Sequence, residues 1–370
     1  MQTQKQAIPM LNSIHLCRGI AALLVVLFHA AANLARDKYF GTAAQPIESL
    51  FWFGGAAGVA FFFVLSGFII HHVHARDMDR PQTLPAYLRK RAVRIYPTYL
   101  IVFMGVYLLT MLSPSLRDDL PTDPAVLLKS LLLIPQDSQK VGGTGAPVLI
   151  VAWSLQYELC FYAAFATGLV KKWLLYCVGL AFMVNFFLQP FLPSQEFPGS
   201  FFSSHLIVLF GIGMAASKAV QARPRLSSPG VLVALSAGAF CIIAVAANLS
   251  RDNYSKPVFD LAYGLVSALL IVALASHDMQ HKQKPAPGRL SFLGNSSYAL
   301  YLIHFPLIAV LSKVATAVLP KNSYGAGLAF LFLVGACVLV AALFHRFIER
   351  PVLRYLAPAR PLAQAAAKHG

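Results

Sequence analysis

Residues 16–29 read LCRGIAALLVVLFH. The ten residues between Arg18 and His29 carry no polar side chain, which is typical of a helix in the hydrocarbon core of a membrane. At 1.5 Å per residue, the two residues lie roughly 16 Å apart along such a helix. Eleven residues make close to three turns, so both side chains share one face. Because ionisable groups are costly inside a membrane segment, the pair is a candidate functional site. Alternatively, Arg18 extends to the membrane interface and His29 bonds a neighbour there.

The composition of the chain indicates an integral membrane protein. Its 370 residues are 58% hydrophobic and 12% charged, whereas soluble domains carry about 25% charged residues. We therefore expect one membrane domain that fills nearly the whole chain. The formal net charge is +16, but the basic residues cluster in short segments between apolar runs. That pattern is typical of topology signals and contacts with anionic lipid headgroups, and it disfavours nucleic acid as a partner.

The apolar runs predict an all-α, polytopic membrane bundle of about ten transmembrane helices. Each run is near the 20 residues needed to span a bilayer. With the N-terminus in the cytoplasm, 21 of the 30 Lys and Arg residues fall on the inner side, so both termini are expected there. A run at 125–134 is too short to span and predicts a surface or re-entrant helix. The ten predicted spans are 14–33, 50–71, 94–113, 148–170, 173–191, 201–219, 230–249, 258–276, 294–316 and 325–345.

The second predicted span contains small residues where another helix can approach closely. Residues 54–70 read GGAAGVAFFFVLSGFII, with glycine at positions 54, 55 and 58. Such positions favour helix packing over a substrate role. Ser66 precedes Gly67, and this pair can loosen the helix within the membrane. We do not assign Ser66 as a nucleophile, because no base or oxyanion partner is local to it.

Four basic residues precede the third predicted span in the segment RKRAVR at 89–94. A cytoplasmic topology anchor explains part of this cluster. Arg91 and Arg94 are three residues apart, however, and share a face if the segment is helical. Arginine favours bidentate contacts with phosphate. The pair therefore predicts a cytoplasmic anionic ligand, such as a nucleotide-bearing cofactor.

Three further ionisable residues fall in or next to predicted spans. Glu158 lies near the middle of the fourth span, where a carboxylate costs on the order of 3 kcal/mol unless it is paired or neutral. We expect it either to pair with Arg18 or to orient and charge-stabilise His29. His304 is mid-span beside Pro306 and is more often a structural histidine than a ligand. Glu349 stands among arginines at the inner interface, which predicts a local salt bridge.

These segments, taken in order, resemble the bacterial membrane acyltransferase-3 family. Residues 18–29 are similar to its arginine–ten residues–histidine motif, and FFVLSGF at 62–68 resembles its second-span signature. The segment RAVR at 91–94 is similar to its Arg-x-x-Arg element, and WSLQYE at 153–158 to its Trp-Ser-Leu-x-x-Glu element. SYALYLIH at 297–304 and IERP at 348–351 match its C-terminal blocks. The resemblance implies a membrane acyltransferase domain over residues 10–355, followed by a short basic cytoplasmic tail at 356–370.

The resemblance also implies a function and roles for individual residues. The family transfers acyl groups, usually acetyl from acetyl-CoA, to hydroxyls of cell-envelope glycans or exopolysaccharide. The expected partners are a carbohydrate or lipid-linked sugar acceptor, membrane lipids and polysaccharide biosynthesis proteins, in the bacterial inner membrane; no metal is expected. Neutral imidazole suits a general base near pH 7, and it can also carry an acyl group. The implied catalytic residues are His29 and Glu158, and the implied acyl-CoA-binding residues are Arg18, Arg91 and Arg94. The implied substrate contacts or structural supports are Ser66, Tyr157, Tyr298, His304 and Glu349.

A secondary transporter is the second class that the sequence allows. Ten spans, the intramembrane residues Glu158 and His304, and a span interrupted by Pro306 all fit such a protein. An inverted repeat would favour this class, and we find no convincing one. Acyl-CoA binding by the purified protein discriminates best between the two classes.

Overall fold

The computed structural model describes residues 12–113, 120–191, 196–222, 226–251, 256–281 and 288–356. Those residues form helices and connecting segments without any strand, which confirms the predicted all-α class. The α-helices are α1 (Asn12–Leu34), α2 (Gln45–Phe51), α3 (Gly54–His74), α4 (Leu84–Leu112), α5 (Pro124–Leu131), α6 (Ser138–Val141), α7 (Trp153–Val170), α8 (Lys172–Leu188), α9 (Gly199–Phe202), α10 (His205–Ala222), α11 (Pro229–Leu249), α12 (Lys256–His281), α13 (Gly288–Val318), α14 (Ser323–Phe344) and α15 (Arg350–Leu356).

Each of the ten predicted spans coincides with a helix of the structure. Within the described residues, eight helical segments are long and apolar enough to cross a membrane by length and composition. They contain α1, α3, α4 and α10–α14. The other two predicted spans correspond to α7 and to α8, which is a shorter apolar helix. The chain is thus a polytopic helical membrane protein, while the count of ten and the cytoplasmic termini stay predictions.

Several boundaries differ from those expected. We expected the basic segment 89–94 to be a loop before the third span, but it is helical, because α4 begins at Leu84. The predicted interruption at Pro306 is wrong, because α13 continues through this proline. The segment at 125–134 contains the short helix α5, as expected. The predicted basic tail lies outside the described residues from residue 357 onward.

Glycines of α3 permit a close helix contact, as the sequence predicted, and the structure shows that the partner is α1. A Cβ added to Gly58 would lie 2.7 Å from the carbonyl oxygen of Ala21, and one on Gly54 would lie 2.5 Å from that of Leu24. Only glycine permits this approach of the two backbones. The contact fixes the height of α1, and therefore of Arg18 and His29, against α3.

The lower half of α3 packs against α10 by a reciprocal pair of glycines. A Cβ on Gly67 would overlap the carbonyl oxygen of Phe210, and one on Gly213 would overlap that of Val64. Further along, His71 Nδ1 lies 2.9 Å from Ser217 Oγ, so the two helices run parallel. This close packing places α3 at the centre of the bundle, between α1, α10 and α12.

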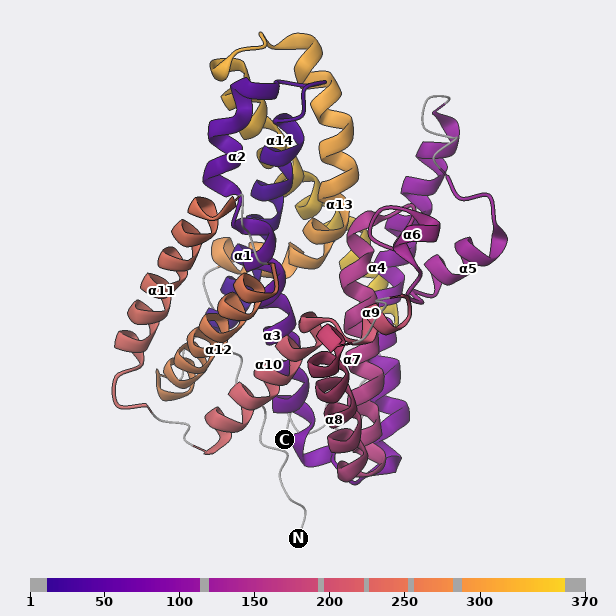
Figure 1. Cartoon of the computed structure of the whole chain (residues 1–370), viewed down its shortest axis with the longest axis vertical. Helices are drawn as coiled ribbons and strands as arrows, with labels where there is room; N and C mark the ends of the chain where they lie inside the picture. Colours follow the sequence, from indigo (N-terminus) through magenta and orange to yellow (C-terminus); the bar gives the residue numbers. More distant parts are fainter. Residues whose placement is uncertain are drawn as a thin grey trace, which may run out of the picture.

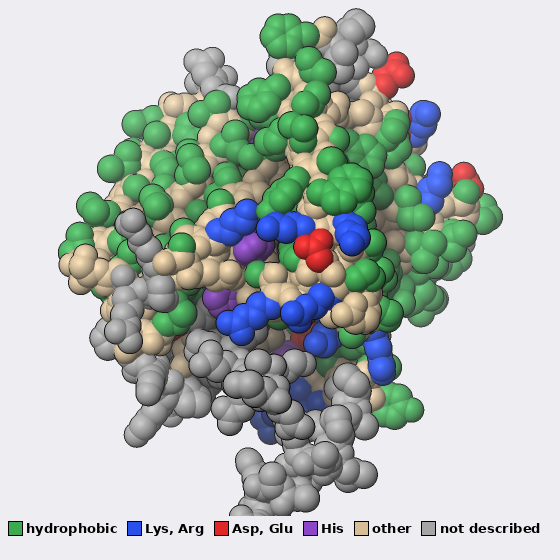
Figure 2. All heavy atoms as spheres, turned by 90° about the horizontal axis from the view of Figure 1, so that it is seen from below, with side chains coloured by type: hydrophobic (Ala, Val, Ile, Leu, Met, Phe, Trp, Pro, Cys, Tyr) green, Lys and Arg blue, Asp and Glu red, His purple; other side chains and the backbone are tan. Residues whose placement is uncertain are grey.

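The helices form three groups around α3. Figure 1 shows α1, α2, α13 and α14 toward the upper end, α4–α9 on one side, and α10–α12 on the other. At the lower end of this view, Lys and Arg side chains gather around histidine and acidic side chains (Figure 2). If both termini are cytoplasmic, this basic end is the cytoplasmic one.

Candidate active site

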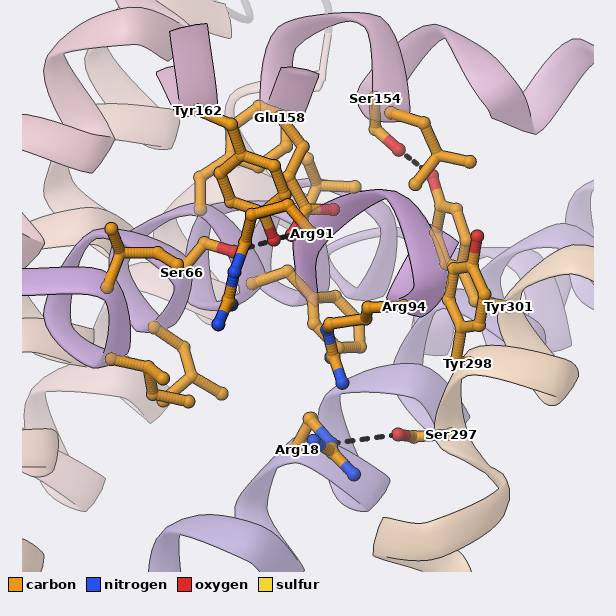
Figure 3. Close-up of a pocket in the computed structure, with 17 residues that line it drawn as sticks. Arg18, Ser66, Arg91, Arg94, Ser154, Glu158, Tyr162, Ser297, Tyr298 and Tyr301 are labelled. Carbon is orange, nitrogen blue, oxygen red and sulfur yellow. Dashed lines mark hydrogen bonds between the residues drawn. The ribbon is translucent and has the colours of Figure 1, made fainter. Parts of the chain in front are cut away.

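A cavity of about 320 Å³ lies between α1, α3, α4, α7 and α13. Figure 3 shows side chains from segments far apart in the sequence converging on it. Its apolar wall includes Val59, Phe62 and Ile69 of α3. The polar and charged side chains that line it are Arg18, Ser66, Arg91, Arg94, Ser154, Glu158, Tyr162, Ser297, Tyr298 and Tyr301.

Positive charge dominates this cavity. Three of its lining residues, Arg18, Arg91 and Arg94, are cations, and Glu158 is the one anion among them. In the described part of the chain, no carboxylate lies within 4 Å of any of the three guanidinium groups. An excess of cations in a partly enclosed space favours an anionic ligand.

Arg91 and Arg94 share one face of α4, as the sequence predicted. The guanidinium carbon of Arg91 lies 5.7 Å from the ring centres of both Tyr87 and Tyr162, within cation–π range. Its Nε is buried and has no hydrogen-bond partner among the described residues. The Arg94 side chain is exposed and points into the cavity toward Arg18 (Figure 3). Both guanidinium groups are therefore available to a ligand.

Arg18 of α1 is hydrogen-bonded to α13. Its Nε donates to Ser297 Oγ at 3.0 Å, and its Nη2 donates to the carbonyl oxygen of Gly294. Gly294 permits this contact because a Cβ there would meet the carbonyl oxygen of His15 at 2.4 Å from α1. Two neutral acceptors orient the guanidinium group and leave its charge uncompensated.

Glu158 makes neither of the contacts that we expected for it. It forms no salt bridge with Arg18 and no hydrogen bond with His29. Instead Oε1 accepts hydrogen bonds from Ser66 Oγ, at 2.8 Å, and from the Tyr162 hydroxyl. The tyrosine is one turn further along α7, so helical spacing brings donor and acceptor together. Two hydroxyl donors thus hold the carboxylate in the cavity wall.

Tyr301 of α13 lines the cavity beside Ser154. Its hydroxyl lies 2.7 Å from Ser154 Oγ and donates to the carbonyl oxygen of Val151 at 3.0 Å. Its ring centre lies 5.9 Å from those of both Phe62 and His304. Tyr301 therefore separates the cavity from the histidine behind it.

His29 and His304 form a pair beyond Tyr301. His304 Nε2 lies 3.1 Å from His29 Nδ1, and the ring centres are 5.0 Å apart. His304 is fully buried, whereas His29 is partly exposed. Phe28 and Phe305 lie edge-on to the His29 ring, with ring centres at 5.0 and 5.4 Å. An imidazole is thus held in an aromatic frame about three helical turns from Arg18.

The structure brings most of the predicted site residues together, but not all of them. Arg18, Ser66, Arg91, Arg94, Glu158 and Tyr298 line the cavity. Tyr157 does not line it, and its ring stacks on Phe201 with centres 4.1 Å apart. Glu349 is also outside, and its predicted local contact is with His345 rather than with an arginine. Its carboxylate lies 2.6 Å from His345 Nδ1 and accepts from Thr98 Oγ1 at 3.3 Å.

Sequence reasoning missed several residues of the cavity. Tyr162 and Tyr301 were not singled out, although Tyr162 stands one turn after Glu158 and Tyr301 one turn before His304. Ser154 and Ser297 were also missed, because serine is common in helices and gives no signal by itself. Within the described ranges, no group of three or more His, Cys, Asp or Glu residues is arranged to bind a metal ion.

Comparisons with known proteins agree with this architecture. The family model described as "Acyltransferase domain" matches residues 11–346. The chain is 29% identical to "Acyltransferase MdmB" of Streptomyces mycarofaciens, over 94% of this chain and 93% of that protein. It is 30% identical to "Exopolysaccharide production protein ExoZ" of Rhizobium meliloti, over 81% and 90% of the two chains. "Peptidoglycan O-acetyltransferase OatA" of Listeria monocytogenes is 23% identical, over 90% of this chain and 54% of that protein. No solved structure matches the chain.

The fold and the cavity define a polytopic membrane protein with a cationic internal site, and Tyr301 separates this site from a histidine pair. The chain belongs to the acyltransferase-3 family. It is therefore an acyltransferase, as the motif resemblance implied. The transporter alternative loses its support, since the interrupted span on which it partly rested is absent from α13.

Proposed function

We propose that this protein is a membrane O-acyltransferase that moves an acetyl group from acetyl-CoA to a hydroxyl of a cell-envelope or exopolysaccharide sugar. The observation that carries the proposal is the cationic cavity, which has three arginines and one carboxylate. One of its lining residues, Tyr301, packs against His304, and His304 contacts His29. A polyphosphate donor at one end and an imidazole at the other fit acyl transfer between two substrates.

Arg91 and Arg94 are the proposed binding site for the donor's phosphates. Both project from the first turns of α4, neither has a carboxylate partner within the described residues, and both line the cavity. Bidentate contacts to phosphate are the use for which a guanidinium group is best suited. The apolar wall of α3 then accommodates the pantetheine arm. Arg18 lines the same cavity, where its guanidinium group can donate a hydrogen bond to the thioester carbonyl oxygen.

Two chemical routes at His29 fit the geometry. In direct transfer, His29 removes the proton of the sugar hydroxyl, whose oxygen attacks the thioester carbon. The C–S bond breaks, and the proton ends on the released thiol. In the relay, a ring nitrogen of His29 attacks the thioester first, the C–S bond breaks, and an acyl-imidazolium and a thiolate form. The sugar hydroxyl then attacks the acyl carbon and releases the neutral ring, and the proton of the hydroxyl ends on the thiolate, so His29 is unchanged at the end of the cycle.

Glu158 supports either route by holding Ser66 and Tyr162 in the cavity wall. Tyr301 must move aside, or the acyl group must pass it, before the thioester meets His29. We therefore assign Tyr301 to the border between the donor cavity and the histidine pair, and Tyr298 to the cavity wall, where its hydroxyl donates to the carbonyl oxygen of Ile95 at 2.9 Å.

The acceptor is the part of the proposal that rests on relatives. One relative is named for exopolysaccharide production and another for peptidoglycan O-acetylation. A carbohydrate or lipid-linked sugar acceptor in the bacterial inner membrane fits both names. Polysaccharide biosynthesis proteins are then the expected protein partners of this enzyme.

The test is transfer of label from [14C]acetyl-CoA by the purified protein in proteoliposomes. We expect label to appear in exopolysaccharide added as acceptor, and mass spectrometry to show glycan acetyl groups that vanish when the protein is deleted. Incubation without acceptor separates the routes, because the relay leaves label on the protein and direct transfer does not. Absence of both acetyl-CoA binding and labelled glycan would remove the proposal.

A further inference from the structure

The contacts of His304 allow only one placement of its ring hydrogen in the neutral form. Its Nδ1 lies 3.0 Å from the carbonyl oxygen of Leu300, one turn earlier in α13. A carbonyl oxygen can only accept, so Nδ1 must carry the hydrogen and donate it. The Nε2 atom of a neutral His304 is then bare. This bare nitrogen is the one that faces His29.

The same reasoning fixes the hydrogen of His29. Its Nδ1 lies 3.1 Å from His304 Nε2 and 3.0 Å from the carbonyl oxygen of Val25. Both neighbours are acceptors, so the Nδ1–H group of His29 donates to both in a three-centre hydrogen bond. Nε2 of a neutral His29 is consequently bare, and no group in the described residues bonds it.

We propose that His304 is a positioning residue that acts with the Val25 carbonyl to fix the tautomer and the direction of His29. His29 then meets the sugar hydroxyl or the acyl group with its Nε2 atom. This inference rests on the proposed role of His29 in acyl transfer. The nitrogen that reacts is set by the hydrogen bond that the other nitrogen makes.

The arrangement also stabilises the charged state that forms during transfer. When Nε2 takes a proton from the hydroxyl, or takes the acyl group, positive charge spreads to the Nδ1–H group. Hydrogen bonds from a charged donor are stronger than those from a neutral one, so the bonds to His304 and Val25 strengthen at that moment. In serine proteases a buried carboxylate has this position. Here a neutral imidazole avoids the cost of burying a second charge in the membrane.

His304 is well suited to such a role because its own ring is fixed. It has no exposed surface, and Tyr301 packs against one side of it. The Cys337 Sγ atom of α14 lies 3.9 Å from the His304 carbonyl oxygen, which anchors this turn of α13. A rigid partner holds the His29 ring more tightly than a mobile one.

The experiment combines 15N NMR of histidine-labelled protein with transfer kinetics. In the wild-type protein the His29 signal, identified by its loss in His29→Gln, should show a protonated Nδ1 and a bare Nε2. His304→Leu removes the acceptor, and His304→Gln keeps one, because its Oε1 atom can accept from Nδ1–H. We expect kcat to fall about tenfold to 100-fold in His304→Leu, less than for loss of a whole general base because Val25 remains. In His304→Gln we expect kcat to recover much of this loss. The KM for acetyl-CoA should be unchanged in both variants.

The matched control is His71→Leu, which removes another buried histidine of the bundle with one side-chain hydrogen bond, to Ser217. Its kcat should stay near that of the wild type. A proton on Nε2 of His29 in the wild-type protein would overturn the inference, as would equal kcat in folded His304→Leu and wild-type protein. Equal losses of kcat in the Leu and Gln variants would show that His304 acts only through packing. If His304→Leu does not fold, the wild-type spectrum and the Gln variant decide. If the wild type transfers no acetyl group, the proposed function fails, and the spectrum still tests the tautomer.

Discussion

Alanine at Arg91 and Arg94 is the perturbation that tests the donor site most sharply. Neither guanidinium group has a carboxylate within 4 Å in the described residues, so its removal leaves no protein anion unpaired. Replacing Arg91 also removes a buried Nε atom that has no hydrogen-bond partner among the described residues. The loss should therefore fall on ligand binding and hardly on folding.

The magnitude follows from the hydrogen bonds that each arginine can give to a phosphate. A hydrogen bond to a charged group contributes about 1.5–3 kcal/mol, which corresponds to roughly a tenfold to 150-fold change in Kd. Two arginines that share one ligand are coupled, so the double variant should lose less than the product of the two single losses. We expect the acetyl-CoA Kd of the double variant to rise about 100-fold or more.

The assay is equilibrium binding of [14C]acetyl-CoA to detergent-purified protein, with Tm measured alongside. Arg89→Ala is the matched control, because Arg89 belongs to the same basic cluster and the same helix but is exposed and does not line the cavity. It should bind acetyl-CoA like the wild type. Unchanged Kd in the double variant, or an equal loss in Arg89→Ala, would reduce the cluster to a topology signal.

Three further predictions concern single positions. Arg18→Ala should weaken acetyl-CoA binding about tenfold or more and lower Tm, because the Gly294 carbonyl and Ser297 lose their donor; equal binding with a lower Tm would make Arg18 purely structural. Glu158→Gln should tighten acetyl-CoA binding, because it removes the anion of the cavity. The repulsion between this carboxylate and a phosphate charge about 10 Å away is on the order of 1.5 kcal/mol at an effective dielectric of about 20, or roughly tenfold in Kd. Weaker acetyl-CoA binding by Glu158→Gln in a titration would contradict this. Gly67→Ala should destabilise the bundle by about 1–3 kcal/mol or more, because the new Cβ would overlap the Phe210 carbonyl. In a thermal unfolding assay, Gly67→Ala should therefore lower Tm. The control Gly179→Ala should leave Tm unchanged, because the space around Gly179 is open.

The helical architecture was largely predictable because the membrane allows few alternatives. Lipid leaves backbone polar groups no partner except each other, so long apolar runs must be helices. A close helix contact at Gly54 and Gly58 was predictable because small residues mark such contacts, but its partner, α1, was not. Where α4 begins was not predictable, because basic residues at a membrane surface suit a loop and a helix equally.

The partners of the buried ionisable groups were harder to predict than their presence. The sequence marks Glu158 as costly in a membrane, but it does not say which distant residue relieves the cost. Ser66 of α3 does so, across 92 positions of sequence, together with Tyr162. The contact of His29 with His304 spans 275 positions and depends on the parallel packing of α1 and α13. Such pairings depend on tertiary packing, which local patterns do not contain.

We propose that His29 carries out the transfer while the arginines hold the donor. The most direct measurement is the acetyl transfer rate of folded His29→Gln protein, with acetyl-CoA binding measured on the same sample. Glutamine can replace a structural hydrogen bond of His29 but cannot act as a base near pH 7 or carry the acyl group. Loss of a general base costs about 10²–10⁴-fold in rate, and loss of a covalent relay costs more. We predict a loss of at least that size with an acetyl-CoA Kd close to the wild-type value; substantial residual transfer by His29→Gln would contradict the account.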